Sequence, residues 1–106
     1  MASACEISII IPVFNEADKL SELLNNIRAL RLASAEIIVI DDGSTDGSSD
    51  VAMNAGANVI RHPYNIGNGA AIKSGIRAAH GRLLVFMDGD GQHKPQDILK
   101  LLAQAK

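Results

Sequence analysis

The sequence predicts an α/β fold in which one parallel β-sheet is covered by helices on both faces. Runs rich in β-branched residues alternate with segments of helical periodicity, which is the pattern of consecutive βαβ units. The first run, ISIIIPVF, is apolar throughout, as expected of a strand that is buried on both faces. With 106 residues, of which 47% are hydrophobic, the chain is long enough for one domain with its own core.

The first half of the chain predicts two strands and a helix between them. The first strand covers 7–14, and a helix follows over 17–31. Apolar residues recur there at the spacing of an amphipathic helix, namely Leu20, Leu23, Leu24, Ile27 and Leu30. The second strand, EIIVIDDGS, starts at residue 36 and leads directly into turn residues.

The second half continues the alternation of strands and helices. A short helix over 48–55 is capped by Asp46 and Ser48 and ends at Gly56, before a weaker strand, ANVIRH. The stretch 65–81 predicts a helix that opens with glycines, and RLLVFMD at 82–88 is the fourth strand. Pro95 suits the first position of a last helix over 95–106.

We expect a doubly wound, Rossmann-like sheet with the strand order 3-2-1-4. In such sheets ligands bind outside the carboxyl ends of the strands, where the winding reverses. Polar residues follow three strands at this edge, namely Asn15 and Glu16, Asp41 and Asp42, and Asp88 and Asp90. Carboxylates gathered in one crevice repel each other unless a cation lies among them. Their oxygens favour Mg²⁺ or Mn²⁺, which also accept phosphate oxygens, so the pattern predicts a substrate with a diphosphate.

Composition excludes some partners and indicates a compartment. A net charge of −2 and 3% aromatic residues are unsuited to binding nucleic acid. The lone Cys5 cannot form an internal disulfide, and the N-terminus lacks the pattern of a signal peptide or a membrane span. We therefore expect a cytoplasmic protein. The histidines, His62, His80 and His93, lack metal-ligand spacing and are expected to face solvent.

Four ordered motifs, IIIPVFNE, IIVIDDGSTDGS, NIGNGAAIKSGI and VFMDGDGQH, carry a resemblance to a known family. From Ile7 onward the chain resembles the N-terminal half of family 2 glycosyltransferases of the GT-A fold. It is most similar to the branch with dolichyl- and polyprenyl-phosphate mannosyl- and glucosyltransferases. The resemblance implies one nucleotide-sugar-binding domain over residues 1–106, with the acceptor-binding half of the family absent.

The resemblance also implies roles for individual residues. Those implied to bind the nucleotide are Pro12, Phe14, Glu16, Asp41, Asp42, Lys73 and Asp88. Asp88 and Asp90 match the catalytic Asp-x-Asp of the family, which binds the divalent ion on the diphosphate, and Gln92 matches a further metal ligand. Asn68 and Lys94 depart from residues common in this branch, which leaves the subgroup open.

The implied activity is an inverting sugar transfer from a GDP- or UDP-sugar to an acceptor such as a polyprenyl phosphate at the membrane surface. The metal, Mg²⁺ or Mn²⁺, would neutralise charge on the leaving diphosphate. Two alternatives stay open. One is a nucleotide-sugar-binding or assembly module without catalysis. The other is a haloacid-dehalogenase-like phosphohydrolase, because VFMDGDG is similar to the two-aspartate motif of those enzymes.

The fourth strand also predicts self-association. In the GT-A fold, strands from the second half flank this strand, so in a 106-residue chain it would be a bare sheet edge. Between Arg82 and Asp88 it carries neither proline nor charge to discourage pairing. We expect a homo-oligomer formed through this edge.

Overall fold

The structure is a computed structural model that describes residues 5–88 and residue 100. Strands and helices alternate in the order β1 (Ile7–Val13), α1 (Ala17–Ala29), β2 (Ala35–Asp41), α2 (Ser48–Asn54), β3 (Asn58–Arg61), α3 (Asn68–Ala78) and β4 (Leu83–Phe86). Apart from Lys100, the helix predicted over 95–106 lies outside the described residues. None of the helices described is long and apolar enough to cross a bilayer.

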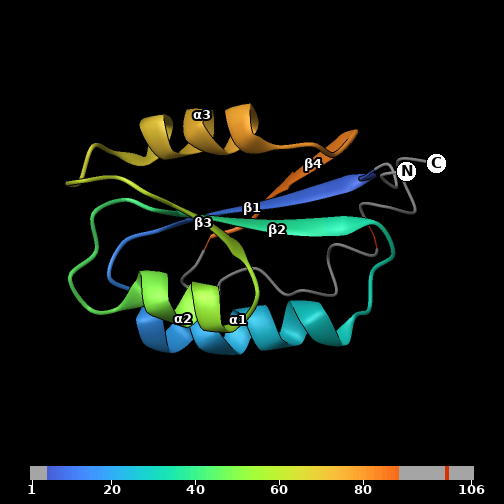
Figure 1. Ribbon diagram of the computed structural model, residues 1–106, viewed down its shortest axis with the longest axis horizontal. Coiled ribbons are helices and arrows are strands. Elements are labelled where there is room, and N and C mark those ends of the chain that lie inside the picture. The colour runs from blue at the N-terminus through green and yellow to red at the C-terminus, as the bar shows by residue number, and fades with distance from the viewer. Residues whose placement is uncertain (1–4, 89–99, 101–106) are drawn as a thin grey trace.

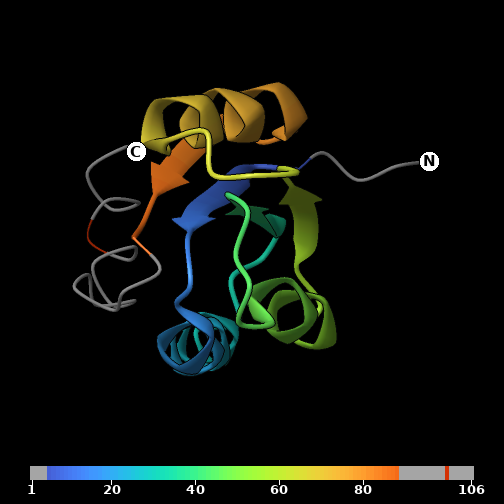
Figure 2. The same cartoon turned by 90° about the vertical axis from the view of Figure 1, so that its left-hand side faces the viewer.

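All strand pairs are parallel, and the sheet has the order β3-β2-β1-β4, which confirms the predicted fold class and strand order. Helices α1 and α2 cover one face of the sheet, and α3 covers the other (Figure 1). The view along the strands shows the same three layers (Figure 2). The carboxyl ends of β1, β2 and β4 therefore lie at one edge of the sheet, where the sequence predicts the ligand site.

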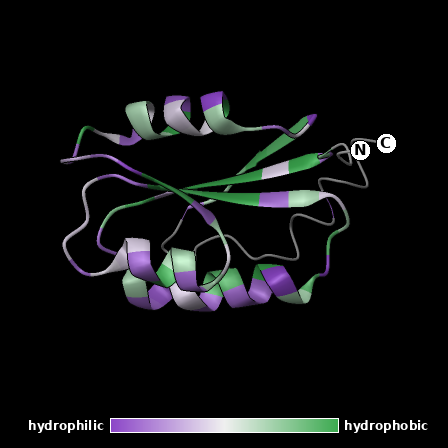
Figure 3. Ribbon diagram, viewed as in Figure 1, coloured by the Kyte–Doolittle hydropathy of each residue, from purple (hydrophilic) through white to green (hydrophobic). Residues whose placement is uncertain are grey.

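The side chains of β1 alternate between two apolar layers, which explains why its sequence is apolar throughout. Ile9 and Ile11 pack among side chains of α1 and α2, whereas Ile10 packs with Ile38, Ile40 and Ala71 on the α3 side. The central strands are accordingly the most hydrophobic part of the ribbon (Figure 3). Two-sided burial favours an unbroken apolar strand over an alternating one.

Helix α3 lies very close to the sheet because it carries a glycine at the point of contact. A Cβ atom at Gly75 would collide with the Ile10 side chain and would lie 3.1 Å from Ile40 Cδ1. The helix itself gains nothing from glycine, which costs roughly 1 kcal/mol relative to alanine in a helix interior. Close packing against β1 and β2 accounts for the residue at this position.

Two helices are shorter than predicted, for identifiable reasons. Helix α1 ends before Arg31, which has a positive φ of 50°. Helix α3 starts at Asn68 because the 62–67 segment before it is bonded to Asp42. It ends at Ala78, and shortly after this end the backbone turns to the sheet, with His80 N donating to Glu36 and Gly81 N donating to Ser8.

Among the described strands, β4 forms one edge of the sheet. Its Phe86 side chain is 44% exposed, whereas Leu84 packs against the apolar layer beneath α3. The exposed large apolar side chain on this strand is therefore Phe86.

Candidate functional site

A cavity of about 390 Å³ opens where β1, β2 and β4 end. Its walls come from the ends of these strands, the 62–67 segment and the first turns of α3, and the lining residues are Pro12, Val13, Phe14, Glu16, Asp42, Asn65, Gly67, Asn68, Ala71 and Asp88. Five of the predicted nucleotide-binding residues are among them, namely Pro12, Phe14, Glu16, Asp42 and Asp88. The strand ends thus bring together residues that are up to 76 positions apart, from Pro12 to Asp88.

Three carboxylates from three different connections line this cavity. Glu16 follows β1, Asp42 follows β2 and Asp88 follows β4. Within residues 5–88 and Lys100, no three His, Cys, Asp or Glu side chains are close enough to hold a metal ion. The other predicted metal ligands, Asp90 and Gln92, lie outside the described residues.

Asp42 is buried in the cavity wall and is hydrogen-bonded on both carboxylate oxygens. Oδ1 lies 2.7 Å from His62 Nδ1 and accepts from Ile66 N at 3.0 Å, and Oδ2 accepts from Gly67 N at 2.8 Å. Burial raises the pKa of Asp42, but the hydrogen bonds from His62, Ile66 and Gly67 outweigh it and leave the pKa below its ordinary value. A deprotonated Asp42 therefore holds the 62–67 segment in place.

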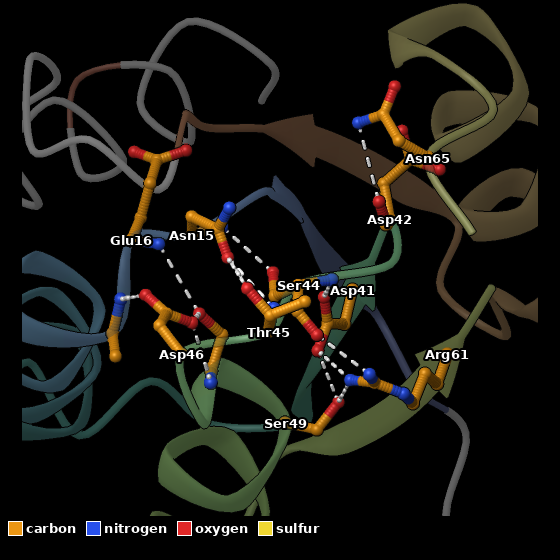
Figure 4. A network of polar contacts seen from close by, with 12 residues as sticks. Asn15, Glu16, Asp41, Asp42, Ser44, Thr45, Asp46, Ser49, Arg61 and Asn65 are labelled. Atoms are coloured by element: carbon orange, nitrogen blue, oxygen red, sulfur yellow. Dashed lines mark hydrogen bonds and ion pairs between the residues drawn. The ribbon is translucent and has the colours of Figure 1, made fainter. Parts of the chain in front are cut away.

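Asp41 does not line the cavity, although it is the neighbour of Asp42. Its carboxylate accepts from Ser44 N at 2.8 Å and from Ser49 Oγ at 2.5 Å, and it pairs with Arg61. Burial raises the pKa of Asp41, but these hydrogen bonds and the Arg61 charge outweigh burial. The pKa therefore lies below its ordinary value. Figure 4 shows Asp41 directed toward Arg61 and Ser49, away from Asn65 above Asp42.

A network of side-chain to backbone bonds places Glu16 at the cavity. Asn15 has a positive φ of 52°, and its Oδ1 accepts from Thr45 N at 2.8 Å. Asp46 accepts from Ala17 N at 3.0 Å and from Ser48 N at 3.1 Å (Figure 4). Asp46 therefore accepts backbone N–H groups at the N-termini of α1 and α2. The N-cap of α2 is Gly47, however, and Ser48, which was predicted to cap this helix, is its first residue.

Lys73 and the histidines are placed differently from the cavity residues. Lys73 is exposed on α3 and is not among the residues that line the cavity. His80 is exposed, as predicted, and lies near Glu36 at 3.2 Å, while His93 is outside the described residues. The prediction for His62 is wrong, because it is buried between Asp42 and α3, where its ring finds polar partners.

Several lining residues were not predicted to take part. They include Asn65, Gly67 and Asn68. Asn and Gly in NIGNG are equally typical of an ordinary turn before a helix. Only the fold, which carries this turn over the end of β2, shows that these residues belong to the site.

Comparisons with known proteins agree with this architecture. The sequence model of the family described as "Glycosyl transferase family 2" matches residues 8–106. The undecaprenyl-phosphate 4-deoxy-4-formamido-L-arabinose transferase of Pseudomonas fluorescens is 38% identical in an alignment of 111 positions that covers 94% of this chain and 32% of that protein. The chain thus spans about a third of the length of this relative.

Two solved structures share the fold. Glucosyl-3-phosphoglycerate synthase from Mycobacterium tuberculosis, solved with Mn²⁺, UDP and glucosyl-3-phosphoglycerate, superposes with a TM-score of 0.80 at 27% identity, covering 94% of this chain and 39% of that chain. A mannosyltransferase from Pyrobaculum calidifontis, solved with GDP-Man and Mn²⁺, superposes with a TM-score of 0.73 at 25% identity. The superposition covers 80% of this chain and 27% of that chain. Both are glycosyltransferases of the GT-A fold.

Proposed function

The chain belongs to glycosyl transferase family 2, and on this premise we propose that it binds the sugar donor of a glycosyl transfer, a sugar linked to a nucleoside diphosphate. The observation that supports this most strongly is the cavity at the strand ends. Its lining combines the apolar wall of Pro12 and Phe14 with the carboxylates of Glu16, Asp42 and Asp88. Such a site has one apolar surface for a base or sugar and one acidic side for a metal-bound diphosphate.

We assign the metal ion to Asp88, Asp90 and Gln92, with Asp88 and Asp90 as the catalytic pair. Asp88 lines the cavity, and its carboxylate oxygens are ligands of the kind that Mg²⁺ and Mn²⁺ prefer. Mn²⁺ in the two similar structures supports a divalent ion without deciding between the two metals. When bound, the ion would neutralise charge on the diphosphate leaving group.

We assign the nucleotide to the side of the cavity formed by Pro12, Phe14 and Asp42. We assign Asp41 an indirect role in nucleotide binding, because its carboxylate is already bonded to Ser44, Ser49 and Arg61. Through these bonds it fixes the turn next to Asp42. Lys73 is exposed on α3 and would have to extend toward the cavity to meet a phosphate. Either GDP or UDP is a candidate nucleotide, because each occurs in one of the similar structures.

The proposed acceptor is a polyprenyl phosphate, with inversion at the anomeric carbon. A relative named for transfer to undecaprenyl phosphate supports this acceptor class. A lipid phosphate is already an anionic nucleophile, which reduces the need for a protein base. The proposed location is accordingly the cytoplasmic surface of a membrane. Family membership disfavours the phosphohydrolase alternative, while a donor-binding module without catalysis remains the second candidate.

Titration calorimetry with GDP- and UDP-sugars, with and without Mn²⁺, tests the proposal. We expect one nucleotide class to bind, and to bind more tightly when Mn²⁺ is present. Binding without product release in the presence of polyprenyl phosphate would favour the non-catalytic module. No binding of either class would contradict the proposed donor site.

A further inference from the structure

His62 lies between polar side chains from two layers of the fold. Its Nδ1 is 2.7 Å from Asp42 Oδ1, and its Nε2 is 2.9 Å from Ser74 Oγ. Asp42 follows β2 and Ser74 lies in α3, so the imidazole joins the sheet to the helix above it. His62 is only 7% exposed, which leaves little access for water to compete for these bonds.

The Asp42 carboxylate decides which groups donate and which accept in the series Asp42, His62 and Ser74. Burial raises the pKa of Asp42, but the hydrogen bonds that it accepts outweigh burial and keep the pKa below its ordinary value, so at neutral pH its oxygens only accept. Nδ1 of His62 must therefore carry a hydrogen and donate it to Asp42. In the neutral imidazole, Nε2 then accepts from the Ser74 hydroxyl.

The Asp42 carboxylate also sets the position of the cavity wall. It accepts the backbone N–H groups of Ile66 and Gly67, at 3.0 and 2.8 Å. The segment passes so close to the preceding turn that a Cβ atom at Gly43 would lie 2.5 Å from the Tyr64 carbonyl carbon. A rotation of the Asp42 side chain would therefore displace the segment that carries two lining residues, Asn65 and Gly67.

The order of groups, Asp42, His62 and Ser74, is also that of a serine-hydrolase triad. Hydrolysis requires oxyanion donors beside the serine. Ser74 lies inside α3, where backbone N–H groups are used within the helix, and it is not among the residues that line the cavity. The arrangement therefore favours a positioning role over nucleophilic catalysis.

We propose that His62 is a positioning residue for nucleotide binding, which orients Asp42 and thereby holds the 62–67 segment against the cavity. This inference rests on the proposed donor-binding function. His62 does not line the cavity, and its side chain is linked to the cavity wall by its bond to Asp42.

Two substitutions separate the bonds of His62. In His62→Asn the amide nitrogen takes the place of Nδ1 and keeps donating to Asp42. In His62→Gln the amide nitrogen takes the place of Nε2 and bonds to Ser74 in the reversed direction, by donating to the hydroxyl oxygen. Affinity for UDP and GDP is measured with Mn²⁺, together with thermal unfolding. We expect His62→Gln to lose about tenfold or more in affinity, as for a lost hydrogen bond to a charged group, and His62→Asn to stay within about threefold of wild type.

A second readout needs no nucleotide. Hydrogen exchange of the Ile66 and Gly67 amides should accelerate in His62→Gln and remain slow in His62→Asn. His80→Gln is the matched control, because His80 is an exposed histidine bonded to Glu36 on β2, and it should change neither readout.

The outcomes are distinct. Equal losses of affinity in both variants, in step with their loss of stability, would overturn the positioning role. So would protected Ile66 and Gly67 amides in His62→Gln. If His62→Gln fails to fold, a tenfold loss in folded His62→Asn still overturns it. A wild-type chain that binds neither UDP nor GDP would instead overturn the proposed function.

Discussion

Asp41 and Arg61 occupy paired positions on the neighbouring strands β2 and β3, and Arg61 Nη1 lies 2.7 Å from Asp41 Oδ2. The Asp41 side chain is fully buried, while half of the Arg61 side chain is exposed. Arg61 Nη2 also donates to the Ser44 carbonyl at 2.7 Å. The pair therefore fastens the end of β3 to the turn that carries Asp42.

From this arrangement we predict that Asp41→Asn lowers the free energy of unfolding by about 1.5 to 3 kcal/mol, the range for a lost hydrogen bond to a charged group. Urea unfolding provides the measurement. Glu22→Gln, at an exposed position of α1, is the control and should stay within about 0.5 kcal/mol. Unchanged stability in Asp41→Asn would show that its partners are satisfied without the charge.

Stability should fall in acid. Burial raises the pKa of Asp41 and of Asp42, but their hydrogen bonds outweigh it, so both folded-state pKa values lie below the ordinary 3.8. A lowered folded-state pKa adds stability that is fully present above the unfolded value and is lost as the pH falls through the folded value. We therefore expect the loss to occur below pH 3.8. Unfolding curves measured down to about pH 2 should show a shallower loss in Asp41→Asn than in wild type.

Asp42→Ala should weaken the binding of nucleotides and nucleotide sugars alike, by about 1.5 to 3 kcal/mol. The expected cause is the loss of both the carboxylate and the bonds that hold the 62–67 segment. Calorimetry should give the same loss with and without Mn²⁺. A loss confined to titrations with Mn²⁺ would place Asp42 in the metal site instead.

Self-association through β4 is a further prediction, and the structure identifies its best probe. Leu84 packs beneath α3, whereas Phe86 is 44% exposed on this edge strand. Phe86→Lys should therefore reduce the oligomer seen by sedimentation across a concentration series. Ile76→Lys is the matched control, because Ile76 is 47% exposed on α3. A wild-type chain that stays monomeric at the highest concentration would contradict the prediction.

Much of the fold could be predicted because local patterns and the global arrangement agree. The unbroken apolar character of β1 reflects helices on both faces, and this burial places β1 inside the sheet. The strand order then brings Glu16, Asp42 and Asp88 to one cavity. Each of these residues directly follows a strand or its short extension, which the sequence makes visible.

The different environments of Asp41 and Asp42 could not be predicted from their identical side chains. Successive side chains of a strand point to opposite faces. Asp41 therefore meets Ser49 of α2, while Asp42 meets His62, which bonds to Ser74 of α3. These partners are distant in sequence, and a single sequence gives no signal that they meet. The burial of His62 escaped prediction for the same reason.

The central claim is a donor site that binds a metal-associated nucleoside diphosphate. Asp88 lines the cavity with Glu16 and Asp42, and Asp90 is its proposed partner in holding the ion. Removing one carboxylate relieves repulsion among like charges in the absence of metal, so Asp88→Ala and Asp90→Ala should remain folded.

The most direct measurement is therefore the affinity for UDP and GDP, with and without Mn²⁺, in wild type, Asp88→Ala and Asp90→Ala. Asp50→Ala, at an exposed site on α2, serves as the carboxylate control. We predict that Mn²⁺ increases the affinity of wild type and of Asp50→Ala for one nucleotide and has no effect on either of the other variants. An undiminished Mn²⁺-dependent affinity in Asp88→Ala or Asp90→Ala would contradict the assignment of the metal site.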